Sequence, residues 1–328
     1  MVPTSQQVVI RGALENVSIA FRNPSYIGDQ VYPIINGLNR RTQVALYDRQ
    51  PWFRIGADWR SEGTTAKRGD YSITTKNIDP KQVAFGKAVT DELLFASQEP
   101  MALPIQPIQE ALIFCADQID LFKEYQIAQN IFAQTWADGV GGGTGLAGAW
   151  ASTDSSTNTF VTDVLAGKIA VQSRTGLVPN TLVIDYGTFT KLQTCPAVLD
   201  RIKYTQTGVI TEQLIAALLQ LDTVLVGKAI YTTAKETQPE SSTVSMLNVW
   251  ESSAGKGNAF LFYRPPSAGL RTPSPGYQYR LEENGAWRRS VTYREEWNHQ
   301  SIYEVMEWVD IRAMMTDLGY LWKNTISS

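Results

Sequence analysis

The chain has 328 residues, of which 43% are hydrophobic, and a formal net charge of −3. This length suits two domains, or one large domain with an arm, and the hydrophobic content can fill a sizeable core. Because basic and acidic residues are interspersed and nearly balanced, the charge excludes a strongly basic nucleic-acid binder. No apolar run approaches the length of a membrane span and no secretory signal is present, so we expect a soluble chain that is made in the cytoplasm and has no membrane partner.

The first 90 residues predict extended structure. Residues 1–42 lack sustained periodicity and indicate an N-terminal arm. Residues 43–90 contain two extended segments, rich in aromatic and β-branched residues, around a polar tip at 60–70, and they predict one long hairpin. Since an isolated two-stranded hairpin is marginal in water, we expect it to lie on another surface, either the body of the same chain or a neighbouring subunit.

The middle of the chain is dominated by one long helical pattern. Thr90 predicts the N-cap of a short helix that ends at Ser97. Two apolar rows at three-to-four spacing then predict a helix over 108–137 that is covered on a wide face. The Gly-, Ser- and Thr-rich stretch at 137–158 has no periodicity and predicts a linker, and a further helix is expected from Phe160 to Arg174.

Residues 180–234 predict a small α/β unit. A β-branched strand at 181–185 is followed by helices that begin near Pro196 and after Thr211, the second of which has Thr211 as its expected N-cap. Strands follow at 223–226 and 229–232, then at 244–250 and 259–263. A proline-rich crossing segment at 263–277 has no room for a helix, and the pattern from Tyr277 to the C-terminus is strand-like.

Several short motifs occur in a recognisable order: Pro196-Ala-Val-Leu-Asp-Arg-Ile202, Val224-Leu-Val-Gly-Lys-Ala229, Tyr263-Arg-Pro265, Pro273-Ser-Pro-Gly-Tyr277 and Gly319-Tyr-Leu321. Together with the hairpin and the long helix, this order resembles the major capsid (coat) proteins of tailed bacteriophages, whose fold is shared with bacterial encapsulin shells. The resemblance covers most of residues 40–328. It implies an α+β phage coat fold with an N-terminal arm (1–42), an extended hairpin loop (43–90), a peripheral domain with long strands (91–150 and 271–328) containing a spine helix (108–137), and an inserted axial α/β domain (151–270).

The resemblance also implies a mechanical function. The chain is expected to self-assemble through hexamers and pentamers into the icosahedral head shell around a double-stranded DNA genome, in the virion capsid, after assembly in the cytoplasm of the bacterial host. The implied partners are a portal, decoration proteins and a separate scaffolding protein, because little sequence precedes the arm; packaged DNA is expected to bind only weakly and without specificity. An encapsulin-like nanocompartment shell and an α/β enzyme of unknown reaction are the alternatives.

Residues that could carry chemistry are scarce, so we expect no enzyme and no catalytic, cofactor-binding or metal site. Residues 143–148 match the letters of a dinucleotide-binding glycine motif, but the expected strand before it and helix within it are missing. The single histidine, His299, cannot form a multi-histidine metal site. A nucleophile pair of Cys195 and His299 is conceivable, but the apolar neighbours of Cys195 favour a packing role.

The candidates for contact between subunits are aromatic and charged residues that an isolated chain would leave in water. On the hairpin they are Trp52, Trp59, Arg60, Glu62, Lys67, Arg68 and Asp70, and in the expected axial domain they are Arg201, Lys203 and Arg264.

Overall fold

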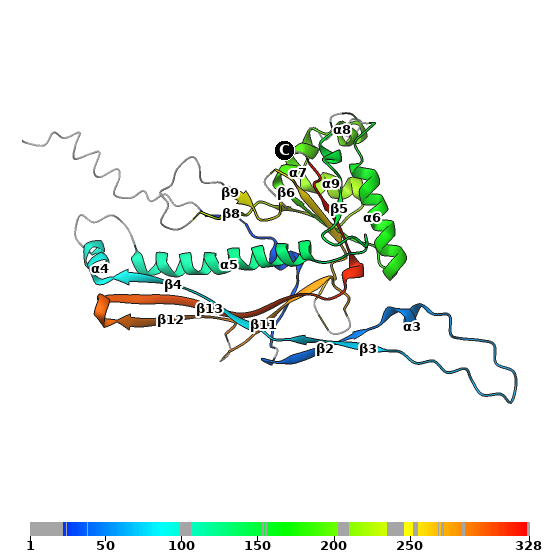
Figure 1. The fold of residues 1–328 in the computed structure, drawn as a ribbon, viewed down its shortest axis with the longest axis horizontal. Helices are drawn as coiled ribbons and strands as arrows, with labels where there is room; N and C mark the ends of the chain where they lie inside the picture. The colour runs from blue at the N-terminus through cyan, green and yellow to red at the C-terminus, as the bar shows by residue number, and fades with distance from the viewer. Residues whose placement is uncertain are drawn as a thin grey trace, which may run out of the picture.

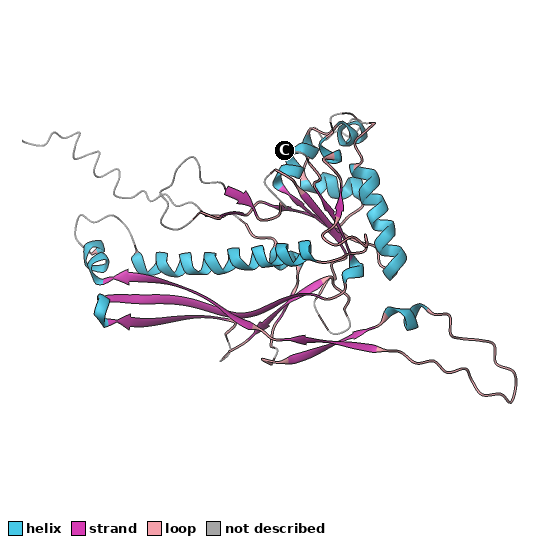
Figure 2. Cartoon of the chain, viewed as in Figure 1, coloured by secondary structure: helices cyan, strands magenta, loops and turns pink. Residues whose placement is uncertain are grey.

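The computed structural model describes residues 22–326, except for positions 24, 38, 99–105, 153, 155, 203–209, 235–245, 252–254, 268, 270–271 and 284–285. The molecule is elongated (Figure 1). A long helix lies along a sheet of long strands, a compact α/β unit stands at one end of this pair of layers, and a hairpin projects beyond that end (Figure 2).

The long helix, α5 (Pro107–Ala133), packs against a five-stranded sheet, which we call the long sheet (Figure 1). The sheet consists of β1 (Ile34–Ile35), β4 (Lys81–Thr90), β11 (Gly276–Leu281), β12 (Arg288–Glu295) and β13 (Gln300–Ala313). Cys115 and Ile119 of α5 pack with Val305 of β13 between the two layers. The helix is four residues shorter at its C-terminus than the sequence predicts. The indole of Trp136 donates a hydrogen bond of 2.8 Å to the carbonyl of Ile131, and Gln134 is extended, so the chain leaves the helical path here.

The compact unit contains a second five-stranded sheet and four helices. In spatial order its strands are β5 (Thr144–Gly145), β14 (Gly319–Lys323), β10 (Asn258–Phe262), β6 (Thr181–Asp185) and β7 (Thr223–Gly227). Its helices are α6 (Phe160–Thr175), α7 (Tyr186–Gln193), α8 (Pro196–Ile202) and α9 (Glu212–Leu219). Every residue of β6 is buried, as expected for a central strand with both faces covered. The predicted strands at 181–185 and 223–226 are confirmed, and so is the Thr211 cap, whose hydroxyl accepts a hydrogen bond from the Leu214 amide. The strand predicted at 229–232 forms as β8 (Ile230–Thr232), but it pairs with β9 (Met246–Asn248) in a separate two-stranded sheet.

Two segments differ from the sequence-based expectation for this unit. Strand β14, which the predicted boundaries assign to the peripheral domain, pairs with β10 inside the compact unit. The predicted linker at 137–158 is partly ordered, because β5 pairs with β14 and Trp150 is fully buried, its indole donating a 2.8 Å hydrogen bond to Asp163. Both differences depend on pairing between segments more than fifty residues apart in the chain, which local periodicity does not report.

The hairpin is shorter than predicted. Strands β2 (Thr42–Tyr47) and β3 (Ile73–Ile78) pair along six residues, and a short helix, α3 (Arg49–Phe53), follows β2. The second half of the expected hairpin arm, residues 81–90, forms β4 and pairs with β13 instead. The prediction is therefore wrong for residues 81–90. These residues gain ten paired positions along β13, and α5 covers one face of β4.

The remaining elements are short. They are α2 (Gly28–Val31), α4 (Asp91–Ser97), β8 (Ile230–Thr232), β9 (Met246–Asn248), and the 3₁₀ turns η1 (Ala149–Ala151), η2 (Glu296–Asn298) and η3 (Thr316–Leu318). The predicted helix from Thr90 to Ser97 is confirmed as α4, with the Thr90 hydroxyl as its cap. Of the expected arm, residues 1–21 lie outside the described part of the chain, and the part that is described places α2 against α5.

Candidate assembly surfaces and a buried polar junction

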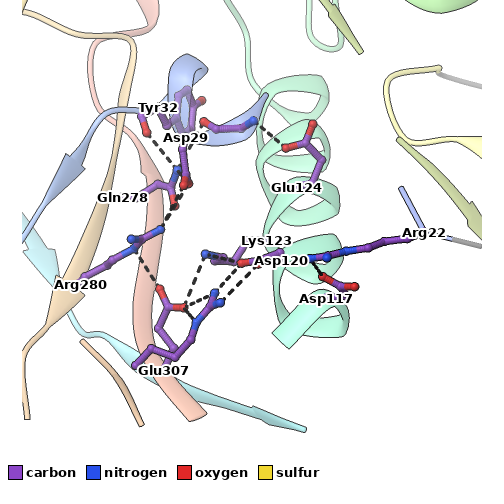
Figure 3. A network of polar contacts seen from close by, with 12 residues as sticks. Arg22, Asp29, Tyr32, Asp117, Asp120, Lys123, Glu124, Gln278, Arg280 and Glu307 are labelled. Carbon is purple, nitrogen blue, oxygen red and sulfur yellow. Dashed lines mark hydrogen bonds and ion pairs between the residues drawn. The ribbon is translucent and has the colours of Figure 1, made fainter. Parts of the chain in front are cut away.

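A cluster of charged side chains with a buried centre and an exposed edge lies where α2, α5 and the long sheet meet (Figure 3). We call it the polar junction, and its members are Asp29, Asp120, Lys123, Glu124, Arg280, Arg288 and Glu307. Its centre is Glu307 of β13, which is 1% exposed. The Glu307 carboxylate lies 2.9 Å from Nε of Arg280, 3.1 Å from a terminal nitrogen of Arg288 and 3.5 Å from Nζ of Lys123. A buried carboxylate of this kind persists because cations surround it.

The junction attaches residues 29–32 of the arm to the long sheet. Asp29 of α2 lies 3.3 Å from a guanidinium nitrogen of Arg280 and accepts a 2.9 Å hydrogen bond from the Gln278 side chain. The same amide nitrogen of Gln278 donates to the carbonyl of Tyr32 at 3.0 Å. The Tyr32 ring is fully buried over Gly276, which leaves no room for a larger residue there. The arm is therefore attached to β11 by ion pairing, hydrogen bonding and close packing together.

Glu124 connects three parts of the chain. Its carboxylate accepts hydrogen bonds from the amides of Gly28 at 2.6 Å and Ile27 at 3.2 Å, both in the arm, and from the indole of Trp250 at 2.7 Å. Burial raises the pKa of this carboxyl above its usual range, while the three donated hydrogen bonds act in the opposite direction. Glu124 thus joins the arm and the segment before β10 to the middle of α5.

The mixed charges of the junction suit it to hold α2, α5 and the long sheet together. They do not suit it to bind a ligand that carries a single sign of charge. A cavity of about 580 Å³ borders it, and the cations on its wall, Arg22, Lys123, Arg280 and Arg288, alternate with Asp29, Asp120 and Glu124. Sequence reasoning missed this cluster. A signal existed, because Lys123 follows Ile119 by four residues and Glu124 follows Leu121 by three, so both fall on the apolar rows of the predicted helix.

The hairpin candidates are exposed, in agreement with the expectation that a lone chain leaves them in water. Trp52 is 65% exposed and Trp59 is completely exposed. The rings of Tyr47, Trp52 and Tyr71 form a cluster with centroids 5.8 to 6.2 Å apart at the start of the projecting loop. Beyond it lie the charged candidates Arg60, Glu62, Lys67, Arg68 and Asp70, all exposed.

The root of the hairpin is fixed to the compact unit. Arg49 of α3 lies 2.9 Å from Asp317 of η3 and donates a 3.1 Å hydrogen bond to the carbonyl of Arg174 at the end of α6. Arg174 lies 3.6 Å from the same Asp317 carboxylate. Because these groups are partly exposed, the contacts set the direction of the hairpin with a modest contribution to stability.

The axial candidates lie apart from the hairpin candidates. Arg201 is exposed on α8, at the far side of the compact unit from the hairpin (Figure 1). Arg264 is held locally, since its amide donates a 2.7 Å hydrogen bond to Asn180 and its carbonyl accepts one of 2.9 Å from the same side chain. Lys203 lies outside the described residues. The candidates for contact between subunits therefore lie on two separate surfaces, the hairpin loop and the far side of the compact unit.

The residues considered for enzyme chemistry are not brought together. Cys195 is buried in the core of the compact unit, whereas His299 lies in the turn between β12 and β13 at the other end of the molecule (Figure 1). Residues 143–148 contain β5, and a side chain at Gly143 would collide with Leu321 of β14. Within the described ranges, no cluster of three or more His, Cys, Asp or Glu side chains is arranged to hold a metal ion, and no helix has the length and apolarity needed to cross a membrane.

Comparisons with known proteins agree with the architecture. No protein-family model matches the sequence. The chain is 23% identical over 286 residues, 84% of each sequence, to the "Major capsid protein" of Burkholderia phage BcepMu. Among solved structures, a phage-related protein from Bordetella bronchiseptica RB50 is 19% identical with a TM-score of 0.66, covering 98% of this chain and 97% of that one.

Capsid structures of two phages are similar over nearly the whole chain. The capsid of cyanophage P-SCSP1u has a TM-score of 0.58 at 11% identity and covers 94% of this chain and 90% of that one. The mature capsid of bacteriophage PhiM1 has a TM-score of 0.57 at 11% identity, with 95% and 91% covered. The chain therefore has the fold of bacteriophage capsid proteins, as its sequence resemblance implies.

Proposed function

We propose that this chain is a major capsid protein, many copies of which form the icosahedral head shell around the double-stranded DNA of a tailed phage. The observation that carries the proposal is the sequence match to a phage major capsid protein over 84% of both chains. The capsid fold along almost the entire length supports it independently. This sequence match favours a phage head over an encapsulin-like compartment.

The proposed role is mechanical rather than enzymatic. Exposed aromatic side chains on the hairpin, above all Trp52 and Trp59, would lose their contact with water when a neighbouring copy covers them. Burial of apolar area contributes about 25 cal/mol per Å², whereas each exposed ion pair contributes at most about 1 kcal/mol. In hexamers and pentamers, the aromatic residues would therefore supply most of the free energy of contact between copies at this surface. The charged residues would orient the two copies relative to each other.

The proposal includes the division of the chain into arm, hairpin loop, peripheral domain and axial domain, with one amendment. The pairing of β14 with β10 favours placing residues 319–323 with the axial domain. Arg201 and Lys203 are proposed as contacts between axial domains, and Arg264 as a residue near that surface. The proposed setting is the virion capsid, assembled in the host cytoplasm.

The proposed partners are a portal, a separate scaffolding protein and decoration proteins. A scaffold is expected because identical copies that bind one another by unlike surfaces can form rings or open arrays, so closure at one size needs guidance. Contact with packaged DNA is expected to be weak, since the chain is nearly neutral.

The test is to express the full chain, alone and together with its candidate scaffolding protein, and to examine the product by sedimentation and negative-stain electron microscopy. Uniform shells, or free hexamers and pentamers, are the expected result. A chain that remains a stable monomer under both conditions would contradict the proposal.

A further inference from the structure

The connection between β1 and β2 begins with an asparagine and a glycine. We call residues 36–41 the joint. Strand β1 is fixed on one side of the joint by its pairing with β11 of the long sheet. On the other side, β2 begins at Thr42 and leads out to the hairpin loop (Figure 1). The joint therefore determines how the hairpin is attached to the sheet, and its first two residues are Asn36 and Gly37.

The backbone nitrogen of Gly37 is accessible. The residue is exposed and has a φ of 80°, a conformation that glycine adopts readily and other residues rarely. No atom lies within 4 Å of the point where a side chain would begin. The surroundings of Gly37 therefore leave its nitrogen room to move toward a neighbouring group.

The side chain of Asn36 is also unrestrained. It is exposed and lines a groove of about 1810 Å³ between β2 and the body. Within the described ranges, neither the side-chain amide of Asn36 nor the backbone N–H of Gly37 forms a hydrogen bond. A hydrogen bond to either group would have to break before the two could meet. The Gly37 nitrogen and the side-chain carbon Cγ of Asn36 are thus neighbours that the fold does not hold apart.

Other asparagines lack one of these properties. The side chain of Asn180 donates a 2.9 Å hydrogen bond to the carbonyl of Arg264. Asn39 lies in the same joint and is exposed, but the next residue, Arg40, carries a long side chain beside the nitrogen that would react. Among the asparagines that the structure describes, Asn36 alone is followed by a glycine.

We propose that Asn36 and Gly37 form a site of spontaneous deamidation, which changes the attachment of the hairpin as the protein ages. The Gly37 nitrogen gives its proton to water and attacks Cγ of Asn36, a reaction favoured because both groups belong to neighbouring residues. The new N–Cγ bond closes a five-membered succinimide ring, the Cγ–Nδ2 bond breaks, and the departing nitrogen takes up a proton and leaves as ammonia. One water molecule then breaks either of the two bonds between the ring nitrogen and a carbonyl carbon. One cleavage gives aspartate at position 36 and the other gives isoaspartate, so one water is consumed and one ammonia released.

Both products alter the joint. Each places a carboxylate where the groove had a neutral amide. Isoaspartate also routes the main chain through the former side chain, so the joint becomes longer by one bond. Because β1 keeps its pairing with β11, the displacement falls on the side of β2, and the hairpin is held less firmly.

The test is to incubate the purified full chain at physiological pH and temperature and to follow conversion at Asn36 by peptide mass spectrometry. A protease that cleaves before aspartate but not before isoaspartate distinguishes the two products. Peptides with the second Asn-Gly pair, 284–285, which lies outside the described residues, are counted separately. The rate is expected to lie within about tenfold of that in a synthetic peptide of residues 33–40, because the fold does not hold the reacting groups. A slower reaction in the folded chain would overturn the inference.

Asn39 is the control within the same chain, since it is exposed in the same joint. It is expected to stay unmodified while Asn36 is converted, and equal conversion at both positions would contradict the inference. Gly37→Ala is expected to slow the reaction at least about tenfold, because its methyl group hinders the attacking nitrogen. Since alanine is strained at a φ of 80°, Asn36→Gln is a second variant, in which the ring would be larger and form more slowly. Conversion of either variant at the unmodified rate would show that other atoms react.

A second measurement follows the hairpin itself. Limited proteolysis within residues 36–47 is expected to be at least about twofold faster in the aged chain than in the fresh chain, and unchanged by ageing in Asn36→Gln. Equal effects of ageing in both chains would show that the reaction at Asn36 does not alter the attachment of the hairpin. All these measurements use the unassembled chain, so their outcome does not depend on whether the chain forms shells.

Discussion

At the scale of single residues, the polar junction shows how a charge can occupy the centre of a long strand. Glu307 is surrounded by Arg280, Arg288 and Lys123, and the side chains of Arg280 and Lys123 are themselves only 7% and 6% exposed. Mutual attraction offsets the cost of removing these groups from water only while all partners are present. The junction therefore specifies how α5 and the long sheet align. Removing one of its charged partners should lower the free energy of unfolding.

Glu307→Gln is expected to lower the free energy of unfolding by about 3 kcal/mol, because it leaves buried cations without their shared carboxylate. Urea denaturation of the unassembled chain measures the change. Glu304→Gln, three positions earlier on β13 and partly exposed, is the control and should change stability by less than about 0.5 kcal/mol. Equal effects of the two substitutions would contradict this account of the junction.

Glu124 predicts a dependence of stability on pH. Burial raises its pKa in the folded chain above the ordinary value of 4.5, so between the two values the folded state binds the proton more readily than the unfolded state. The stability that Glu124 contributes through its raised pKa is therefore fully present below pH 4.5, the pKa of the unfolded chain. It is lost as the pH rises through the higher pKa of the folded chain. The stability advantage of the unmodified chain over Glu124→Gln should shrink as the pH rises.

Urea denaturation of both chains from about pH 4 to about pH 8 tests this prediction. Glu110→Gln, at an exposed position of the same helix, should give a difference from the unmodified chain that does not vary in this way. Parallel stability curves for the unmodified chain and Glu124→Gln would show that Glu124 does not titrate as described.

At the scale of elements, the arm and the hairpin are both extended segments attached to the body by a few contacts. For the arm, the contacts centre on α2 and Tyr32. For the hairpin, they are those of Arg49 and of Lys76, whose ammonium donates 3.1 Å hydrogen bonds to the carbonyls of Ala313 and Met314. Neither segment could keep a defined direction by its own hydrogen bonds alone. Their attachment points therefore determine where each segment reaches.

Gly276→Ala should loosen the arm. A Cβ atom at this position would lie 2.4 Å from the buried Tyr32 ring, so the ring and α2 must move, at a cost of about 1 to 3 kcal/mol. Faster cleavage near Tyr32 in limited proteolysis and a lower melting temperature are the expected results. Gly69→Ala, where no atom lies within 4 Å, is the matched control. Unchanged proteolysis in Gly276→Ala would mean that Tyr32 does not anchor the arm.

At the scale of the whole molecule, the structure separates what stabilises one subunit from what is available to its neighbours. The two large cores lie inside the compact unit and between that unit and α5. The hairpin loop, by contrast, projects past the end of the body (Figure 1) and carries large side chains in water. Such a shape is typical of a chain whose final burial occurs between copies.

Trp59→Ala should separate folding from assembly. Since this side chain is completely exposed, its removal should change the free energy of unfolding by less than about 0.5 kcal/mol. Assembly, followed by light scattering, should require a higher protein concentration because apolar area is lost from the contact. Trp59→Phe keeps most of that area and should retain most of the assembly. A clear loss of subunit stability in Trp59→Ala would contradict the assignment.

The sequence by itself determined the elements whose signals are local. The helix α5, the capped helix α9 after Thr211 and the buried strand β6 follow from apolar spacing and from capping side chains within a few residues. The exposed aromatic and charged residues of the hairpin were also identifiable, because an apolar side chain in a polar turn region has no local partner. These features supported the coat fold before any tertiary contact was known.

Only the tertiary structure decided which distant segments pair. The choice of β13 as partner for β4, the insertion of β14 beside β10, and the meeting of Glu124, Glu307 and Arg280 join residues that are far apart in the chain. Any exposed strand offers the same backbone donors and acceptors, so local sequence cannot select among partners. The strand partners are selected because the fold must bury the apolar faces of all its elements at the same time. That arrangement also brings the charged side chains of the polar junction together.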